Sequence, residues 1–396
     1  MVPGGGCHFS SQKGPKELGQ RPARSGEIRS MACSSTGTGC ERCERLPARP
    51  DAPSILYLWP PLGHSAGKIR KHLESGGVPF ETAADGEGMI LQVADDATRQ
   101  SLLALTETLS PEERRAARTL ALAPGETPRF ADYPRVNALD TFLNYLRAGP
   151  LLDTLADNAF EVGFAPIVFA DDHDDIMAHG AQLRFPQMNE PPEMVFDLAR
   201  RADLLHQLDR SARIACIEAA PAQNIDTPVF VEFQPAAIYD PVYCLRTTVD
   251  AAKRVGLPPE NIVFTLNHPK GGYDLGHLQN ILSYYHEQGY EVALGKLGSG
   301  VGALELLQHL RPQYAWLAPR LVAGVAGDPY SGVIARKLLE MAHRLRIDTI
   351  AYADPTSPEA NWLYEHGVNY LANPVNPTEA QAKTSAGDVG HEHAAQ

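Results

Sequence analysis

The stretch of sequence that decides the fold lies at residues 229–266 and reads VFVEFQPAAIYDPVYCLRTTVDAAKRVGLPPENIVFTL. It begins and ends with short apolar runs, 229–233 and 262–266, which are rich in β-branched and aromatic residues and predict buried strands. The residues between these runs include the apolar spacing of an amphipathic helix. A strand, a helix and a second strand in this order predict two parallel strands joined by a helical crossover.

The same alternation extends over residues 158–378. Further apolar runs predict strands at Phe164–Phe169, Val292–Leu294, Tyr314–Leu317, Thr349–Tyr352 and Asn369–Ala372. The clearest of the intervening helices carries an apolar face at Ile334, Leu338, Met341, Ala342 and Leu345. This repetition predicts an α/β fold with a parallel sheet, either open or closed as a barrel.

We expect four parts in the chain. They are a disordered tail at 1–50, a small α/β domain at 51–150, the strand–helix alternation at 151–378 and a disordered tail at 379–396. The tails are predicted from their polar, Gly- and Ser-containing composition without a hydrophobic period. In the small domain, Ser110 followed by Pro111 and two acidic residues predicts the start of a helix.

The charge of the chain excludes some partners. Its 396 residues carry 35 Lys and Arg against 48 Asp and Glu, a formal net charge of −13. The first 50 residues are basic, so the remainder is more acidic than the whole. Such a body is a poor non-specific binder of nucleic acid or of an anionic membrane. No apolar run has the length of a membrane span, and the N-terminus lacks the apolar region of a secretory signal.

The cysteines give two further expectations. Cys33, Cys40 and Cys43 lie in the N-terminal tail, where Met31 is an alternative start to the chain, and Cys40 and Cys43 have the spacing of a zinc-binding pair. Three thiolates would leave a zinc site one ligand short, so free thiols in a flexible tail are the alternative. Cys216 and Cys244 lie in apolar helical patterns and are expected to be buried thiols, which indicates a cytoplasmic protein.

The motifs of the larger part follow a familiar order. They are FAPIV at 164–168, LR at 183–184, FQP at 233–235, IYDP at 238–241, GYEVAL at 289–294, GSG at 298–300, LRP at 310–312, DPY at 328–330 and IARKLL at 334–339. This series resembles the EAL-domain family of bacterial cyclic di-GMP phosphodiesterases over about residues 155–377. The resemblance implies a TIM-like barrel with its site at the carboxyl ends of the strands. The small domain resembles the N-terminal appendage of one EAL subgroup, and family members commonly form homodimers.

The family's activity is hydrolysis assisted by Mg²⁺ or Mn²⁺, yet the matched positions here hold few of the groups it needs. The metal-binding Asn falls on Glu232, the paired Asp residues fall on Gly295 and Lys296, and the assisting Lys falls on Trp316. Other substituted positions are Ala165, Gly180, Thr265, His268, Ala318, Tyr352 and Ala372. Divalent ions need several oxygen ligands, and a lysine beside them repels them. We therefore expect no bound metal cofactor and no catalytic residues in the barrel.

The remaining polar and aromatic residues at these positions are the candidates for ligand binding: Arg184, Glu232, His268, Lys296, Trp316 and Tyr352. Glu232 and Lys296 have exchanged charges, so we expect an ion pair in place of the metals. The alternative is that Lys296, together with Arg184, holds an anionic ligand. Trp316 and Tyr352 either fill the cavity or offer a surface on which a base can stack.

Three functions follow. The first is a catalytically inactive regulatory protein of cyclic di-GMP-type signalling that acts through contacts with an unidentified protein partner. The second is a sensor that binds cyclic di-GMP or another nucleotide without metal. The third is an enzyme, either a residual cyclic di-GMP phosphodiesterase or a different activity in the old cavity. The first predicts a filled cavity, and the second predicts an open, basic mouth with aromatic walls.

Overall fold

The computed structural model describes residues 41–83, 86–267, 274–299 and 302–373. Its larger part is a closed eight-stranded barrel in the order β10-β11-β12-β13-β6-β7-β8-β9. The strands are β6 Glu161–Phe169, β7 Ile176–Arg184, β8 Val229–Phe233, β9 Ile262–Leu266, β10 Glu291–Leu297, β11 Tyr314–Leu317, β12 Asp348–Tyr352 and β13 Tyr370–Ala372. The barrel confirms the predicted α/β class, and it shows that the sheet is closed as a barrel rather than open.

One strand of the barrel runs against the others. Strand β6 pairs antiparallel with both β7 and β13, whereas the neighbouring strands β7, β8 and β9 pair in parallel. Strand β7 was not among the predicted strands, because Gly180, Gln182 and polar neighbours interrupt its apolar pattern. The long pairing between β6 and β7 therefore supplies a hairpin that the strand–helix alternation did not reveal.

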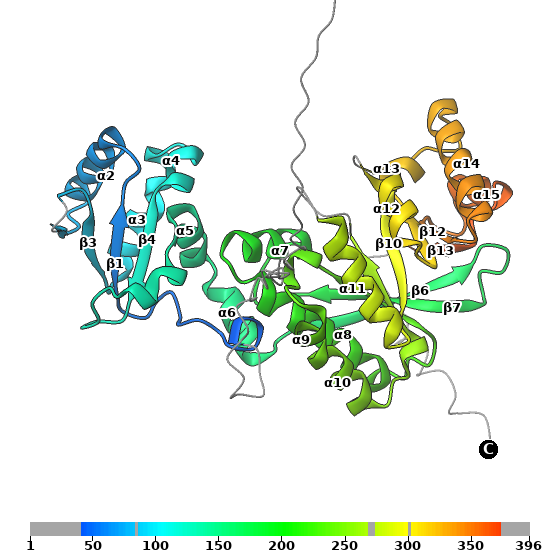
Figure 1. The fold of residues 1–396 in the computed structure, drawn as a ribbon. Helices are drawn as coiled ribbons and strands as arrows, with labels where there is room; N and C mark the ends of the chain where they lie inside the picture. Colours follow the sequence, from blue (N-terminus) through cyan, green and yellow to red (C-terminus); the bar gives the residue numbers. More distant parts are fainter. Residues whose placement is uncertain (1–40, 84–85, 268–273, 300–301, 374–396) are drawn as a thin grey trace, which may run out of the picture. The chain divides into compact units, whose positions relative to one another are not determined.

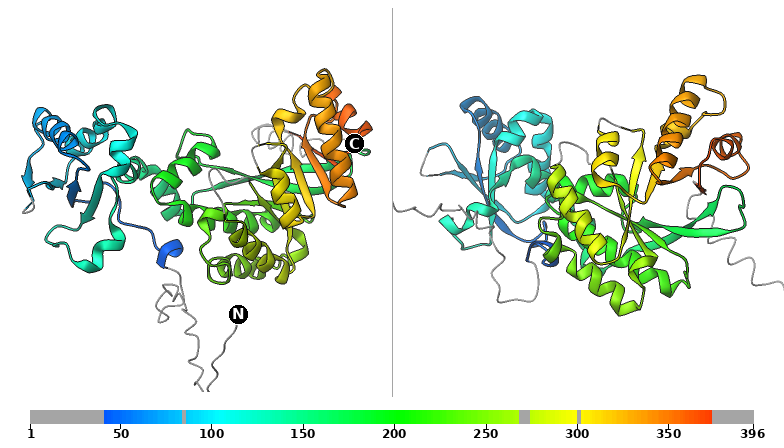
Figure 2. Two further views of the ribbon diagram at one scale, coloured as in Figure 1. Left: turned by 45° about the horizontal axis from the view of Figure 1, so that its top comes forward. Right: turned by 45° about the vertical axis from the view of Figure 1, so that its right-hand side comes forward.

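Helices surround the barrel (Figures 1 and 2). They are α6 Gly149–Asp157, α7 Pro192–Arg201, α8 Leu205–Ala222, α9 Pro241–Cys244, α10 Arg246–Val255, α11 Leu275–Glu287, α12 Ala303–Leu310, α13 Pro319–Val322, α14 Pro329–Arg344 and α15 Pro358–Glu365. Within the described ranges, every helix is too short or too polar to span a bilayer.

The strands separate two apolar layers. Val229, Val231 and Phe233 of β8 belong to the large core between the barrel and its helices, whereas Phe230 belongs to the cluster inside the barrel. The interior cluster consists of Ile167, Ala178, Phe230, Val263, Ala293, Trp316, Ile350 and Ala372. Because side chains alternate along a strand, the register of Phe230 also turns Glu232 toward the barrel axis.

Helix α14 packs on a face that matches the predicted one in part, since Ala342 is buried and Leu338 and Met341 pack against the core. Gly332, Ala335, Leu339 and Ala342 are its buried residues, whereas Ile334 and Leu345 are each 54% exposed. A Cβ on Gly332 would lie 3.4 Å from the ring of Trp362 in α15, so the small side chains permit a close approach on this side. Our assignment of Ile334 and Leu345 to the buried face was therefore wrong.

Residues 54–147 form a five-stranded antiparallel sheet in the order β2-β3-β1-β4-β5. Its strands are β1 Ser54–Trp59, β2 Phe80–Thr82, β3 Met89–Val93, β4 Arg118–Leu122 and β5 Asn137–Ala138, and its helices are α2 Gly63–Ser75, α3 Asp96–Thr108, α4 Pro111–Ala116, η1 Phe130–Arg135 and α5 Leu139–Arg147. Leu56, Leu58, Ile69 and Leu102 lie in its buried core. Ser110 caps α4 through a reciprocal bond with Glu113, as the sequence predicts.

The predicted tail ends earlier than expected. Residues 41–44 form the short helix α1 Glu41–Glu44, in which Cys43 is buried, and Leu46 packs against the apolar cluster that includes Leu204 and Leu208. Arg49 forms an ion pair with Asp153. Residues 41–50, which the sequence assigned to the tail, thus make contacts with the rest of the chain.

Candidate functional site at the barrel mouth

The mouth of the barrel is formed by the carboxyl ends of the parallel strands, where barrels carry their functional groups. Glu232 lies near the carboxyl end of strand β8, two residues after Phe230, so both side chains face the interior of the barrel. Thr265 lies beside it as its register partner on β9. Behind the mouth, the buried Asp209 of α8 accepts a 2.7 Å hydrogen bond from the backbone N–H of Gln234, which fixes the chain directly after β8.

Glu232 has an amide as its direct partner. The Nδ2 of Asn267 donates a 2.6 Å hydrogen bond to Oε2 of Glu232. Asn267 follows the end of β9 and was not among the predicted site residues. Its position could have been predicted from the strand register, because every second residue of a strand faces the same side, and 263, 265 and 267 therefore all face the barrel axis.

Gly295 and Lys296 lie at an irregularity of β10. The register with β11 shifts between Leu294 and Leu297, and Lys296 has a positive φ of 60°. A Cβ on Gly295 would lie 2.5 Å from Oδ1 of Asn267. The amide of Asn267 therefore occupies the volume that a side chain at 295 would need.

The expected ion pair between Glu232 and Lys296 is not formed. In the described part of the chain, no carboxylate oxygen of Glu232 lies within 4.0 Å of Nζ of Lys296. Lys296 nevertheless acts on Glu232 at longer range. The surrounding protein raises the pKa of Glu232, while the charge of Lys296 and the bond from Asn267 lower it, and Glu193 of α7 raises it further. The carboxyl group thus lies in a crowded mouth although its outer surface is exposed.

Trp316 and Tyr352 form an aromatic stack. Their ring centroids are 4.7 Å apart at an interplanar angle of 25°. Trp316 also makes a T-shaped contact with Phe230, with ring centroids 5.8 Å apart. Trp316 is 7% exposed and Tyr352 is 36% exposed, so the first fills the barrel axis and the second forms part of the mouth. Burial, together with the charges of Glu232 and Glu193, raises the pKa of Tyr352, which keeps its hydroxyl protonated.

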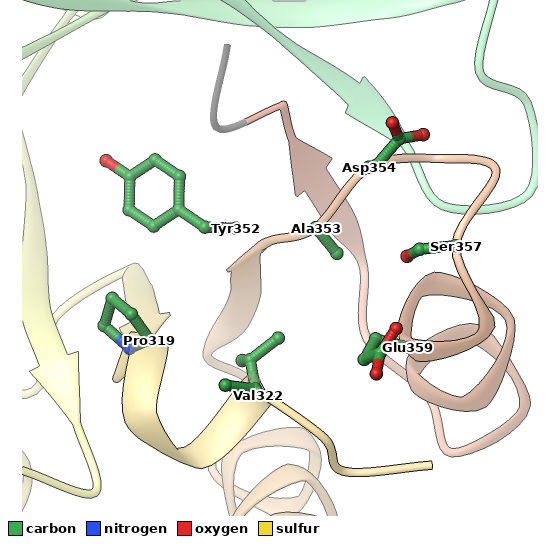
Figure 3. Close-up of a pocket in the computed structure, with 8 residues that line it drawn as sticks. Pro319, Val322, Tyr352, Ala353, Asp354, Ser357 and Glu359 are labelled. Carbon is green, nitrogen blue, oxygen red and sulfur yellow. The ribbon is translucent and has the colours of Figure 1, made fainter. Parts of the chain in front are cut away.

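A cavity of about 210 Å³ lies beside Tyr352 (Figure 3). Its apolar wall comes from α13 and its polar rim comes from the loop after β12. The residues that line it are Pro319, Val322, Ala323, Tyr352, Ala353, Asp354, Ser357 and Glu359. Asp354 accepts hydrogen bonds from the backbone and the hydroxyl of Thr356, and Ser357 caps α15, so both polar groups have local structural partners.

The other predicted site residues are placed as follows. Arg184 is half-buried at the end of β7, opposite Glu161. His268 lies outside the described residues, as do Cys33 and Cys40.

Cys43, the third cysteine of the predicted zinc site, is buried against the barrel rather than in a flexible tail. Cys216 and Cys244 are buried thiols as predicted.

Among the described residues, the donor groups at the mouth do not fit a pair of divalent ions. In the ranges that the structure describes, no group of three or more His, Cys, Asp or Glu residues is arranged to hold a metal. Glu232 and Asn267 supply oxygens there, but they are bonded to each other, and the positive charge of Lys296 acts on Glu232. Mg²⁺ and Mn²⁺ need near-complete shells of oxygen ligands, which this set does not provide.

Comparisons with known proteins agree with the barrel. A family model described as the EAL domain matches residues 149–372. The chain is 26% identical over 247 residues to a probable cyclic di-GMP phosphodiesterase, PdeN, of Escherichia coli, covering 60% of this chain and 47% of the relative. It is 32% identical over 90 residues to a second such protein, PdeB, covering 23% and 17%. The chain thus spans less than half the length of these curated relatives.

A solved structure shares the same fold. The crystal structure of an EAL-domain protein from Listeria monocytogenes matches with a TM-score of 0.52 at 15% identity, covering 60% of this chain and 97% of that one. At this identity the likeness concerns the fold.

Proposed function

The chain belongs to the EAL-domain family, and from this premise we propose that it is a regulatory member that does not hydrolyse cyclic di-GMP and acts through protein contacts. The observation that carries the proposal is the bond between Asn267 and Glu232, in the space where the family places metal ligands. We propose that this hydrogen-bonded pair replaces the metal centre.

Electrostatics supports the loss of hydrolysis. One carboxylate, Glu232, stands at the matched ligand positions, and Lys296 adds a positive charge that acts on the same group. At short range and reduced dielectric, a fixed lysine charge disfavours a divalent cation by several kcal/mol, roughly 4 kcal/mol per unit charge at 4 Å and an effective dielectric of 20. Hydroxide generation by a metal needs that cation in place.

Two features support protein contacts. Trp316 fills the barrel axis, so the cavity beneath the mouth is closed by an apolar side chain. On α14, Tyr330, Val333 and Ile334 are 85%, 53% and 54% exposed, and the 330/333/334 spacing places them on one helical face. Contiguous exposed apolar side chains are typical of interaction surfaces.

The contact surface can be tested with a photo-reactive residue in the native host. We expect a cross-linked adduct when the residue replaces Val333 and none when it replaces His343, which is exposed on the same helix but lies away from the 330/333/334 face. An adduct at neither position would contradict the α14 surface as the site of protein contact.

A second candidate is binding of cyclic di-GMP without turnover. It is favoured by the exposed ring of Tyr352 together with the exposed Lys296, since a base can stack on the ring and a phosphate can pair with the ammonium group. The mouth also carries Glu193 and Glu232, which repel phosphates, so we rank this candidate second.

Calorimetric titration with cyclic di-GMP in Mn²⁺ buffer separates these functions. We expect no heat up to high micromolar ligand. A saturable heat that Lys296→Glu and Tyr352→Ala abolish would establish the second candidate instead. A sustained heat from turnover would contradict both.

A further inference from the structure

The segment before the small domain is held against the barrel by contacts around Cys43. Glu44 lies 3.9 Å from Arg246, and the backbone carbonyl of Arg45 accepts a 3.3 Å hydrogen bond from Gln207 of α8. Arg246 is two residues beyond Cys244, the last residue of α9. These contacts bring residues 43–46 beside residues 244–246, although about 200 positions separate them in the chain.

Two thiols meet at this contact. Cys43 and Cys244 are both buried, each 6% exposed, and their side chains form a hydrogen bond with each other. That bond lowers the pKa of Cys244 against the raising effect of burial, with smaller contributions from backbone hydrogen bonds of Asp240 and Tyr239 and from the positive charge of Arg213. A thiolate is the reactive form of cysteine, so Cys244 has the character of an attacking thiol with a second thiol at hand.

Cys216 provides a contrast within the same layer. It is buried in α8, and burial raises its pKa to about 12. Its thiol therefore stays protonated and unreactive at neutral pH. Among the cysteines that the structure describes, reactivity is thus confined to the contact between Cys43 and Cys244.

We propose that Cys43 and Cys244 form a reversible disulfide under peroxide stress. The Cys244 thiolate attacks one oxygen of hydrogen peroxide, which breaks the O–O bond, gives the sulfenic acid and releases hydroxide. The Cys43 sulfur then attacks the sulfenic sulfur and loses its proton, and the hydroxyl group leaves as water. In total two thiols are oxidised to one disulfide, and one peroxide is reduced to two waters. A dithiol reductant reverses the change by thiol–disulfide exchange.

The bond would fasten α1 to the barrel. Cys244 ends α9, which follows β8 through η2 Pro235–Ala237, so the tie joins the N-terminal segment to the connection that leaves the mouth. Oxidation is expected to hold this segment in place, whereas the reduced pair leaves it attached by weaker contacts, the Glu44–Arg246 ion pair among them. This inference does not depend on the proposed function.

The experiment is disulfide mapping on the full chain. Purified protein is treated with hydrogen peroxide, free thiols are blocked with N-ethylmaleimide, and the tryptic peptides are analysed by mass spectrometry. We expect a Cys43–Cys244 linked peptide that appears with peroxide and disappears with dithiothreitol, with a higher thermal unfolding midpoint for the oxidised chain.

Three variants sharpen the result. Cys43→Ser should abolish the linked peptide and the rise in the unfolding midpoint, whereas Cys216→Ser, the matched control, should leave both unchanged. Cys40→Ser should also leave the linked peptide unchanged. The proposal is overturned if wild-type Cys244 stays fully alkylatable while Cys43 is oxidised, or if Cys43 links to Cys40. Both of these results are measured on the wild-type chain, so they test the proposal even if a variant fails to fold.

Discussion

Asn267 lies in the volume that a side chain on residue 295 would occupy, because its Oδ1 is 2.5 Å from the position of a Cβ on Gly295. A Cβ on Gly180, which stands at another matched family position, would have its nearest neighbour, the backbone oxygen of Ala165, at 3.9 Å. The two glycines therefore differ in the room around them, although both replace larger side chains of the family.

This difference predicts that the same substitution destabilises the chain to different extents at the two positions. Gly295→Ala should destabilise the chain by about 1–3 kcal/mol, the usual cost of overpacking, because Asn267 must move. Gly180→Ala, the matched control, should cost less than about 1 kcal/mol, because its added methyl group meets ordinary contact distances. Urea unfolding measures both. Equal costs would contradict the placement of Asn267.

Trp316 is predicted to be the main filler of the barrel axis. Trp316→Ala should cost about 3–5 kcal/mol by creating a cavity under Tyr352. Its Nε1 is buried and without a hydrogen-bond partner in the described structure. Trp316→Phe removes that unsatisfied donor and keeps an aromatic body, so we expect it to cost clearly less than the alanine variant. A phenylalanine variant as unstable as the alanine variant would show that packing alone does not explain this site.

Asp209 and Arg213 form a buried ion pair behind β8, with side chains 2% exposed and a 2.9 Å contact. Arg213 also donates to Thr248, and Asp209 accepts the N–H of Gln234. Removing one partner leaves a buried charge, so Asp209→Leu or Arg213→Met alone should cost about 3–5 kcal/mol. The double variant should cost less than the sum of the two. Additive costs in a double-mutant cycle would contradict the coupling.

Glu113 predicts a pH dependence in the small domain. The backbone N–H of Ser110, with Lys68 and Ser65, lowers the pKa of its carboxyl to about 2, from an ordinary value of 4.5. A lowered pKa means that Glu113 contributes stability above pH 4.5 and that this contribution disappears as the pH falls through about 2. The unfolding midpoints of wild type and Glu113→Gln should therefore differ most above pH 5 and converge toward pH 2. A constant difference across this range would contradict the assignment.

The sequence predicted most of the barrel because its parallel strands are short, apolar and regularly spaced. It did not predict β7, whose Gly180 and polar residues carry no such pattern. On α14 it wrongly assigned Ile334 and Leu345 to the buried face, because small residues rather than large ones make the closest contacts there. Glu232, Lys296, Trp316 and Tyr352, which it proposed as ligand-binding residues, lie at or beneath the mouth, and their role in binding stays a prediction. Asn267 was missed because its role depends on the distance to Glu232 across two strands.

An assay of hydrolysis tests the proposed loss of the metal centre most directly. The full chain is incubated with cyclic di-GMP and Mn²⁺, and the nucleotides are separated by chromatography over a time course. We expect that cyclic di-GMP persists and that no linear dinucleotide accumulates. A linear product that forms only with metal, and is lost in Glu232→Ala, would show that the mouth retains a working metal centre.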